Sequence, residues 1–406
     1  MSSVIHNFSE IGKLNKVLLH SIGKEIEALT PDNFERLLFD DIPYLKIAVQ
    51  EHERFAQILI ENGAEVVYFV DETVKALKNK AVREEFTKKF IEESEVYSER
   101  AKEAIKQYLD KMDVREMVET IVAGVKKSDV GDINSNSLAD YISSNYPYYT
   151  DPMPNLYFTR DPCACVGNGM SIHHMSRKAR KREALLLHYM FKYNKDFAPE
   201  GSKLWYDFDQ EYSIEGGDIL VLSKEIVAVG LSERTTARAI EKYAENILSE
   251  SSFKKVLVFD IPKCRAFMHL DTVFTMVDYD KFTIHPEIEG PLQVFEIVLD
   301  KKGKAKFSSI KEELVKILSL ELNLPSVDLI KCGGDDMMAA QREQWNDGSN
   351  TLAIAPGVVV TYERNYVTND LLDKKGIKVL TMPSSEISRG RGGPRCMSCP
   401  INRDDL

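Results

Sequence analysis

The chain has 406 residues, of which 43% are hydrophobic and 29% charged, so it is long enough for one large globular domain or two ordinary ones. Its 53 basic and 64 acidic residues give a net charge of −11, which offers no general attraction to nucleic acid or an anionic membrane surface. No apolar run approaches the ~18 residues that span a bilayer, and the N-terminus lacks a leader-like pattern, so we predict a cytoplasmic protein. The six cysteines are few and scattered, which favours reduced thiols.

The first third of the chain predicts one α/β unit followed by a helical segment. Residues 16–21 (KVLLHS) and 65–70 (EVVYFV) predict strands on either side of a helix at Lys46–Glu61. Beyond Glu72 the residues are mostly charged, with neither glycine nor proline before Gly124. The helical patterns lie at Val82–Phe90, Ser98–Leu109 and Val114–Val122, and a polar loop follows at Ser128–Asn145. We therefore predict a small all-helical insertion at 74–146 within a larger domain of 1–73 and 147–406.

The rest of the chain repeats a unit of two strands, a helix and a third strand. The unit is clearest in residues 216–261, where the helix is predicted at Thr236–Leu248, and it recurs in residues 350–382. Looser copies occur around residues 155–193, with a helix at Ala179–Tyr193, and in the first unit, which lacks one clear strand.

A further copy begins with a strand pair in residues 269–288. In that copy, Ser309 and Glu312 have the spacing of a capping box, which predicts that a helix begins there. About five units result. Units that each leave an apolar face uncovered can complete a core around a common axis. The predicted fold class is therefore α/β, with a five-bladed, pseudo-fivefold α/β propeller of ββαβ units.

Two segments contain residue types suited to acid, base or charge-pairing chemistry. His269 and Asp271, if they begin a strand, point to the same face, because side chains alternate along a strand. Residues 155–161 (NLYFTRD) place an amide, an aromatic ring and an Arg-Asp pair in another predicted strand. The structural alternatives are a hydrogen-bonded core pair for His269 and Asp271, and a local salt bridge between Arg160 and Asp161.

Glu215 stands immediately before two glycines, where the backbone allows another group to approach closely. The alternative is an exposed glutamate in a turn or bulge.

Near the C-terminus, residues 389–400 (RGRGGPRCMSCP) place Cys396 after three glycines and three arginines. This pattern predicts a thiol on or beside a mobile, positively charged loop, which would lower the pKa of the thiol and favour a nucleophile. Two other interpretations of the Cys396-x-x-Cys399 pair remain open. It could supply half of a zinc site together with Cys163 and Cys165, or it could form a redox-active dithiol.

Taken together and in order, these motifs resemble the arginine deiminases of the guanidine-modifying, or pentein, superfamily. The resemblance extends along essentially the whole chain. It is carried by segments 153–162 (MPNLYFTRDP), 214–218 (IEGGD), 232–235 (SERT), 268–272 (MHLDT), 347–350 (DGSN) with 355–360 (APGVVV), and 389–400. It implies the five-unit fold with a helical insertion, and hydrolysis of free L-arginine to L-citrulline and ammonia, the first step of arginine catabolism by this route.

The resemblance also implies roles for the catalytic residues. Asp161 and Asp271 would hold the guanidinium group, and Cys396 would attack its carbon to give a covalent S-alkylthiouronium intermediate. His269 would act as general acid and then as general base, while Glu215 would orient His269 and favour its protonated form. Cys399 would take no part in the reaction.

Substrate recognition by resemblance uses a second set of residues. The α-carboxylate of arginine would be bound by Arg180 and Arg234 with help from Asn155, Phe158 would line the alkyl chain, and Arg391 would gate the site. No cofactor or metal is implied. A homodimer or larger homo-oligomer is expected, with no nucleic-acid or membrane partner.

One residue departs from the family pattern, because Cys163 stands where a phenylalanine is expected after the TRDP motif. This change places the packing behind Asp161 in question. The alternatives with the same fold are a dimethylarginine hydrolase, an agmatine deiminase or an amidinotransferase. From another class, the alternative is a catalytically silent arginine-binding protein. Two arginines for a carboxylate argue against agmatine, and the complete set of five catalytic candidates argues against a silent protein.

Overall fold

The computed structural model describes residues 4–131, 133, 138, 145–288 and 292–406, and its strands form five separate mixed sheets. In each sheet a middle strand is antiparallel to one neighbour and parallel to the other. The five triplets are β17-β1-β2, β3-β4-β5, β6-β7-β8, β9-β10-β13 and β14-β15-β16, and the hairpin of β11 and β12 extends the third. The class is therefore α/β, as predicted.

The strands of these sheets have the following bounds: β1 Leu14–Leu19, β2 Glu65–Tyr68, β3 Cys163–Val166, β4 Gly169–Ile172, β5 Lys203–Tyr206, β6 Ile219–Val221, β7 Ile226–Leu231, β8 Lys255–Asp260, β9 Phe274–Met276, β10 Lys281–Ile284, β11 Gln293–Leu299, β12 Ala305–Ile310, β13 Asp328–Lys331, β14 Leu352–Ala355, β15 Val358–Tyr362, β16 Lys378–Met382 and β17 Cys399–Arg403. Every parallel pair is joined by a segment that contains a helix, because parallel neighbours need a long crossover.

The crossover helices are α2 (Leu45–Glu61), α9 (Lys181–Tyr193), α10 (Ala237–Glu250), α11 (Leu314–Glu321) and α13 (Tyr366–Lys374). Side-chain caps fix some of their ends. Thr236 caps α10 by accepting a hydrogen bond from the amide of Ala239, as Ser, Thr, Asp and Asn commonly do at this position. The predicted helices at Lys46–Glu61 and Thr236–Leu248 are confirmed, and the predicted helix at Ala179–Tyr193 is confirmed as α9 preceded by the 3-10 turn η1 (Lys178–Arg180).

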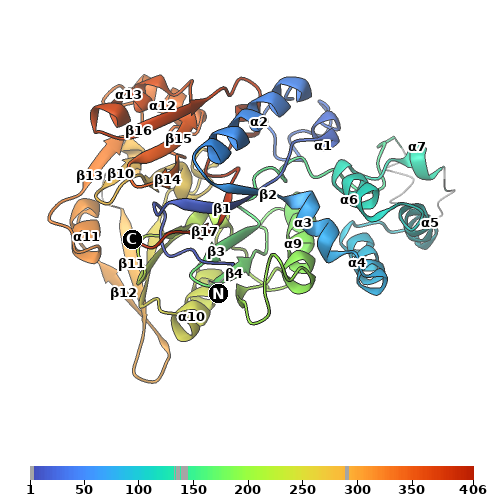
Figure 1. Cartoon of the computed structure of the whole chain (residues 1–406), viewed down its shortest axis with the longest axis horizontal. Helices are drawn as coiled ribbons and strands as arrows, with labels where there is room; N and C mark the ends of the chain where they lie inside the picture. The colour runs from blue at the N-terminus through green and yellow to red at the C-terminus, as the bar shows by residue number, and fades with distance from the viewer. Residues whose placement is uncertain (1–3, 132, 134–137, 139–144, 289–291) are drawn as a thin grey trace.

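A group of helices extends to one side of the sheets (Figure 1), in the region predicted as an insertion. It contains α4 (Lys80–Glu93), α5 (Glu99–Leu109), α6 (Val114–Ala123) and α7 (Lys127–Val130), preceded by α3 (Phe69–Ala76). Phe86, Ile105 and Val118 from this group share one hydrophobic cluster with Leu186 of α9, which attaches the helices to the sheets. Much of the predicted polar loop Ser128–Asn145 lies outside the described residues.

The helix predicted after Ser309 and Glu312 is confirmed as α11, with Leu314, Ile317 and Leu318 buried on one face, but its predicted start at a capping box is wrong. Ser309 lies in β12, where it pairs with Phe295 of β11, and α11 begins only at Leu314. Ser309 adopts the strand conformation because pairing along the hairpin forms several backbone hydrogen bonds, whereas a helix cap forms only one or two.

The strands predicted for residues 155–161 and at His269 and Asp271 are also wrong. Residues 155–161 form a series of turns, and β3 begins only after Pro162, which lacks the amide that a strand would use. His269 precedes a 3-10 turn, η4 (Leu270–Thr272), because the carboxylate of Asp218 accepts the amide hydrogen of Leu270 at 2.8 Å.

The first unit, which lacked one strand in the sequence, is completed by the other end of the chain. Strand β17 pairs with β1 antiparallel, so that the C-terminal segment occupies the position of the missing strand. Cys396 stands just ahead of β17 and is therefore fixed against the first sheet. Within the described residues, no helix combines the length and apolar character needed to cross a bilayer.

Candidate active site

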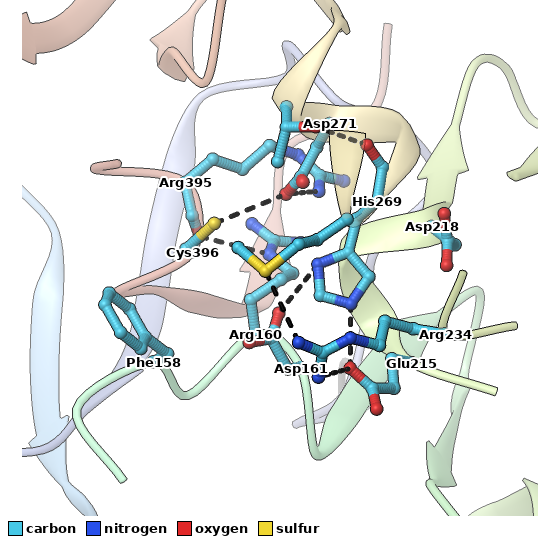
Figure 2. A network of polar contacts seen from close by, with 12 residues as sticks. Phe158, Arg160, Asp161, Glu215, Asp218, Arg234, His269, Asp271, Arg395 and Cys396 are labelled. Carbon is cyan, nitrogen blue, oxygen red and sulfur yellow. Dashed lines mark hydrogen bonds and ion pairs between the residues drawn. The ribbon is translucent and has the colours of Figure 1, made fainter. Parts of the chain in front are cut away.

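Five residues from distant parts of the chain meet at one buried site (Figure 2). None of their side chains is more than slightly exposed, and each residue lies in, or directly before, a turn or 3-10 segment. They are Asp161, Glu215, His269, Asp271 and Cys396. The structure therefore brings together all five candidates that the sequence selected for catalysis.

Glu215 and His269 form the acid-base pair of the site. Nε2 of His269 lies 2.8 Å from Oε2 of Glu215, and Nδ1 lies 3.8 Å from Oδ1 of Asp161. Burial alone lowers the pKa of His269, but the Asp161 carboxylate and the hydrogen bond to Glu215 raise it to about 9. Burial raises the pKa of Glu215. The hydrogen-bonded imidazole and the nearby Arg234 lower it by a larger amount, so the net pKa of Glu215 lies well below the ordinary value. The imidazole is therefore protonated at neutral pH.

The two glycines after Glu215 allow this close approach, as their position in the sequence indicated. A Cβ on Gly217 would lie 2.6 Å from the His269 ring, and a Cβ on Gly216 would lie 2.1 Å from the carbonyl oxygen of Arg160. Both contacts are shorter than any side chain tolerates. Glu215 is fully buried, so the alternative of an exposed glutamate in a turn is wrong.

Asp271 links the candidate nucleophile to a buried arginine. Its Oδ2 accepts a hydrogen bond from Arg395 at 2.7 Å and lies 3.9 Å from Sγ of Cys396. Arg395 also pairs with Glu10 at 3.1 Å, and the amide of Cys396 donates to the side chain of Asn350 at 3.1 Å. Both ends of the Asp271–Cys396 contact are thereby fixed.

The expectation that a positively charged loop lowers the pKa of the Cys396 thiol is wrong. Cys396 is 4% exposed, and burial together with the Asp271 and Asp161 carboxylates raises its pKa well above the ordinary value. The arginines that precede Cys396 do not reverse this shift because Arg395 is paired with Glu10 and Asp271. The thiol is therefore neutral before a substrate binds.

One carboxylate oxygen of Asp161 accepts a hydrogen bond and the other accepts none within the described residues. Oδ2 accepts from Arg180, whose guanidinium also pairs with Glu183 and donates to the carbonyl oxygen of Phe158. Oδ1 of Asp161 and Oδ1 of Asp271 are both buried and have no hydrogen-bond partner among the described residues. Buried carboxylate oxygens are normally hydrogen-bonded, so two such oxygens indicate a site for a cationic donor.

The residues predicted to recognise substrate line one small cavity of about 30 Å³. Asn155 donates to the carbonyl oxygen of Leu37, and Arg234 lies 3.9 Å from Glu215. The cavity lining includes Asn155, Phe158, Asp161, Arg180, Arg234, His269, Arg391 and Cys396. The cavity therefore joins the predicted binding set to three of the catalytic candidates, Asp161, His269 and Cys396.

Comparison with known proteins agrees with this geometry. The family model of arginine deiminase matches residues 35–403. The chain is 52% identical to an arginine deiminase from Clostridium perfringens, over 98% of each chain, and 51% identical to one from Streptococcus agalactiae, over 99% of this chain and 98% of the relative. The chain belongs to the arginine deiminase family.

Solved structures of other enzymes share the fold of this arginine deiminase family member. An amidinotransferase of saxitoxin biosynthesis from Microseira wollei has a TM-score of 0.55 at 14% identity, with 99% of this chain and 98% of that chain covered. The inosamine-phosphate amidinotransferase of Streptomyces griseus has a TM-score of 0.51 at 14% identity, with 100% and 98% covered. At such identities the likeness shows the fold alone.

The two cysteines of the C-terminal motif have different surroundings in this family member. Cys396 contacts Asp271, whereas the sulfur of Cys399 lies 3.5 Å from that of Cys163. All six cysteines are free thiols, and the described residues contain no group of side chains suited to a metal ion. Cys163, the departure from the family pattern, is fully buried against Cys399, and its sulfur lies 3.5 Å from the carbonyl oxygen of Thr159.

Three supporting residues of this arginine deiminase family member were not selected from the sequence. Asp218 accepts from the hydroxyls of Ser232 and Thr235 and from the amide of Leu270, so it fixes the backbone next to His269. Arg395 holds Asp271, and Asn350 holds Cys396. All three lie inside the motifs that carried the resemblance, but their partners are distant in the sequence and no local pattern identifies them.

Proposed function

We propose that this protein hydrolyses free L-arginine to L-citrulline and ammonia. The observation that carries the proposal is a pair of buried carboxylate oxygens on Asp161 and Asp271 that accept no hydrogen bond within the described residues, next to a thiol and a protonated imidazole. A guanidinium is planar and always charged, and it matches paired carboxylates through charge-assisted hydrogen bonds. Membership in the arginine deiminase family supports the same substrate.

Binding of the substrate would prepare the nucleophile. The Asp161 and Asp271 carboxylates hold the Cys396 thiol in its neutral form, and a bound guanidinium offsets their charge. The thiol proton leaves along the 3.9 Å contact to Oδ2 of Asp271 as sulfur bonds to the guanidinium carbon. The product of this step is a neutral tetrahedral adduct.

His269 then expels ammonia. Its imidazolium, kept protonated by Glu215 and Asp161, gives a proton to the leaving nitrogen, and the carbon–nitrogen bond breaks. A cationic S-alkylthiouronium remains on Cys396, and His269 is left neutral. The acid required for this step is therefore already present at neutral pH.

Water completes the reaction on the same residues. Neutral His269 removes a proton from a water molecule as its oxygen bonds to the thiouronium carbon. The adduct expels the sulfur, its hydroxyl proton passes to bulk solvent, and Asp271 returns a proton to Cys396. Citrulline is released with His269 again protonated. Every step uses a side chain or water, so the proposal includes no cofactor or metal.

Recognition of a free amino acid would use the arginines of the cavity. Arg180 and Arg234 supply positive charge for the α-carboxylate with help from Asn155, and Phe158 lines the alkyl chain. Arg180 must then share or exchange its bond to Asp161, because that carboxylate also takes part in binding the guanidinium. A substrate without an α-carboxylate, such as agmatine, lacks the partner for these arginines.

We also propose a higher-order arrangement for the fold. The shared pairing pattern of the five sheets supports a five-bladed, pseudo-fivefold propeller, with residues 74–146 as an all-helical insertion in the catalytic domain of 1–73 and 147–406. A cytoplasmic location remains an expectation from the sequence, and a homodimer or larger homo-oligomer remains an expectation from the family resemblance.

The test of the proposed function is a citrulline assay combined with intact-protein mass spectrometry after rapid quenching with excess L-arginine. Wild type and Cys399→Ser are expected to form citrulline and to carry a transient adduct of arginine minus ammonia. Cys396→Ser should give neither. Wild-type protein without citrulline and without an adduct would disprove the proposal, and citrulline from Cys396→Ser would disprove the role of that thiol.

A further inference from the structure

Arg391, at the roof of the cavity, is stacked on an exposed tryptophan. Its guanidinium carbon lies 3.6 Å from the centre of the Trp345 ring, and Trp345 is 49% exposed. Nε and Nη1 of Arg391 are buried and donate no hydrogen bond within the described residues, and the nearest carboxylate oxygen, on Asp40, is 3.8 Å away. The aromatic face is therefore the main contact that holds this guanidinium.

The cavity beneath Arg391 is too small for an amino acid of the size of arginine. Its volume of about 30 Å³ is sufficient for roughly two water molecules. Leu38 and Gly390 also line it, next to the Arg391 side chain. A substrate can therefore enter only if Arg391 or the lining residues beside it move.

The two partners of the stack differ in how firmly they are held. Trp345 ends α12 (Met337–Trp345), and its neighbour Gln344 donates to the carbonyl oxygen of Thr272 at 2.8 Å, which ties the helix end to the loop of His269 and Asp271. Arg391 has a φ of 60°, a conformation that few non-glycine residues adopt, and glycines stand on both sides of it. The moving partner is therefore Arg391, and the fixed one is Trp345.

The family resemblance already implies that Arg391 gates the site. We propose that Trp345 is the positioning residue that holds Arg391 in the closed position in the substrate-free protein, so that Arg391 must leave the ring when arginine binds. This inference rests on the proposed function. The stack stabilises a state that cannot bind substrate, and the apparent affinity is reduced by the fraction of molecules in that state. Removal of the ring should therefore tighten binding, which is opposite to the effect of damage to a pocket.

The first experiment uses Trp345 as its own probe in the Cys396→Ser background, which prevents turnover. The chain has two tryptophans, and Trp205 is fully buried, so the environment of Trp345 dominates any change in tryptophan emission on binding. We expect L-arginine to change the emission with a midpoint equal to the dissociation constant from calorimetry. Trp345→Phe should bind arginine without this signal, and Arg391→Gln should alter the emission of the free protein.

The second experiment compares dissociation constants in the same background. Trp345→Leu should lower the dissociation constant for L-arginine by about 2- to 10-fold. Tyr366→Leu, which removes an exposed ring from the neighbouring helix α13, should leave the constant unchanged. An unchanged or raised constant in Trp345→Leu would overturn the inference.

The outcomes separate this inference from the proposed function. Arginine binding by calorimetry without a change in Trp345 emission would overturn the inference alone. No arginine binding at all would overturn the proposed function, and the gating role of Trp345 with it.

Discussion

Replacement of Glu215 with glutamine tests the charge that keeps the proton on His269. Oε2 of Glu215 lies 2.8 Å from Nε2 of His269, and both side chains are buried, so the amide keeps the size of the side chain and removes its charge. Burial alone lowers the pKa of His269, and the Asp161 carboxylate and the Glu215 hydrogen bond raise it to about 9. In Glu215→Gln we expect this pKa to fall toward the ordinary value of 6.5.

The expected consequence is a change in the pH profile of kcat/KM for citrulline formation. In wild type, His269 stays protonated until about pH 9, so the basic limb of the profile should lie there. In the variant the limb should move toward pH 6.5, because the neutral imidazole cannot protonate the leaving nitrogen. Each pH unit of displacement lowers the imidazolium fraction about tenfold, so at pH 8 we expect a loss of roughly 10- to 100-fold that is partly recovered at pH 6.

Glu343→Gln is a matched control for this variant. Glu343 is also a buried glutamate, and it accepts hydrogen bonds from the backbone of Val367 and Thr368. Its replacement should leave the pH profile unchanged. A basic limb near pH 9 in Glu215→Gln would refute the role of Glu215 in protonating His269. A loss that is equal at every pH would indicate misplacement of the ring.

Three further predictions follow from the buried charges. Because folding raises the pKa of His269, its charged form stabilises the folded protein fully below pH 6.5, and this stabilisation is lost as the pH rises to about 9. Between these pH values, the free energy of unfolding measured with urea should fall by about 3 kcal/mol more in wild type than in His269→Gln. Arg395→Met leaves Glu10 and Asp271 without their cation and should lower the unfolding free energy by about 3 to 5 kcal/mol; an unchanged urea midpoint would contradict this. Asp271→Asn removes a negative charge next to the thiol, so the pH midpoint for alkylation of Cys396 should fall, while kcat/KM for arginine falls about 10- to 100-fold; a midpoint that rises would exclude the electrostatic cause.

Several helices of this chain could be predicted from the sequence because their signals are local, whereas α12 was not predicted and the start of α11 was placed too early. Ser98 caps α5 and Thr236 caps α10 at the positions that their patterns indicated. The strand assignments around Asp161 and His269 failed for a different reason. The amide of Leu270 is bound by Asp218, a partner 52 residues away, which no local pattern contains.

The five catalytic candidates could be selected from the sequence because they lie in ordered motifs that carry the family resemblance, whereas the supporting residues Asp218, Asn350 and Arg395 could not. The protonation states of the five candidates could not be found in the same way. The arginines beside Cys396 suggested a lowered pKa for its thiol, but a pKa depends on burial and on which charges remain unpaired.

The sequence alone therefore determined the residue types, several helices and the repeated α/β unit of this arginine deiminase family member. Only the tertiary structure decided that β17 completes the first sheet, that Arg395 is neutralised by Glu10 and Asp271, and that the Cys396 thiol is neutral beside two carboxylates. The physical reason is the distance along the sequence over which each kind of interaction acts. Helix caps and side-chain periodicity act over a few residues, whereas burial and electrostatic fields sum over segments that only folding brings together.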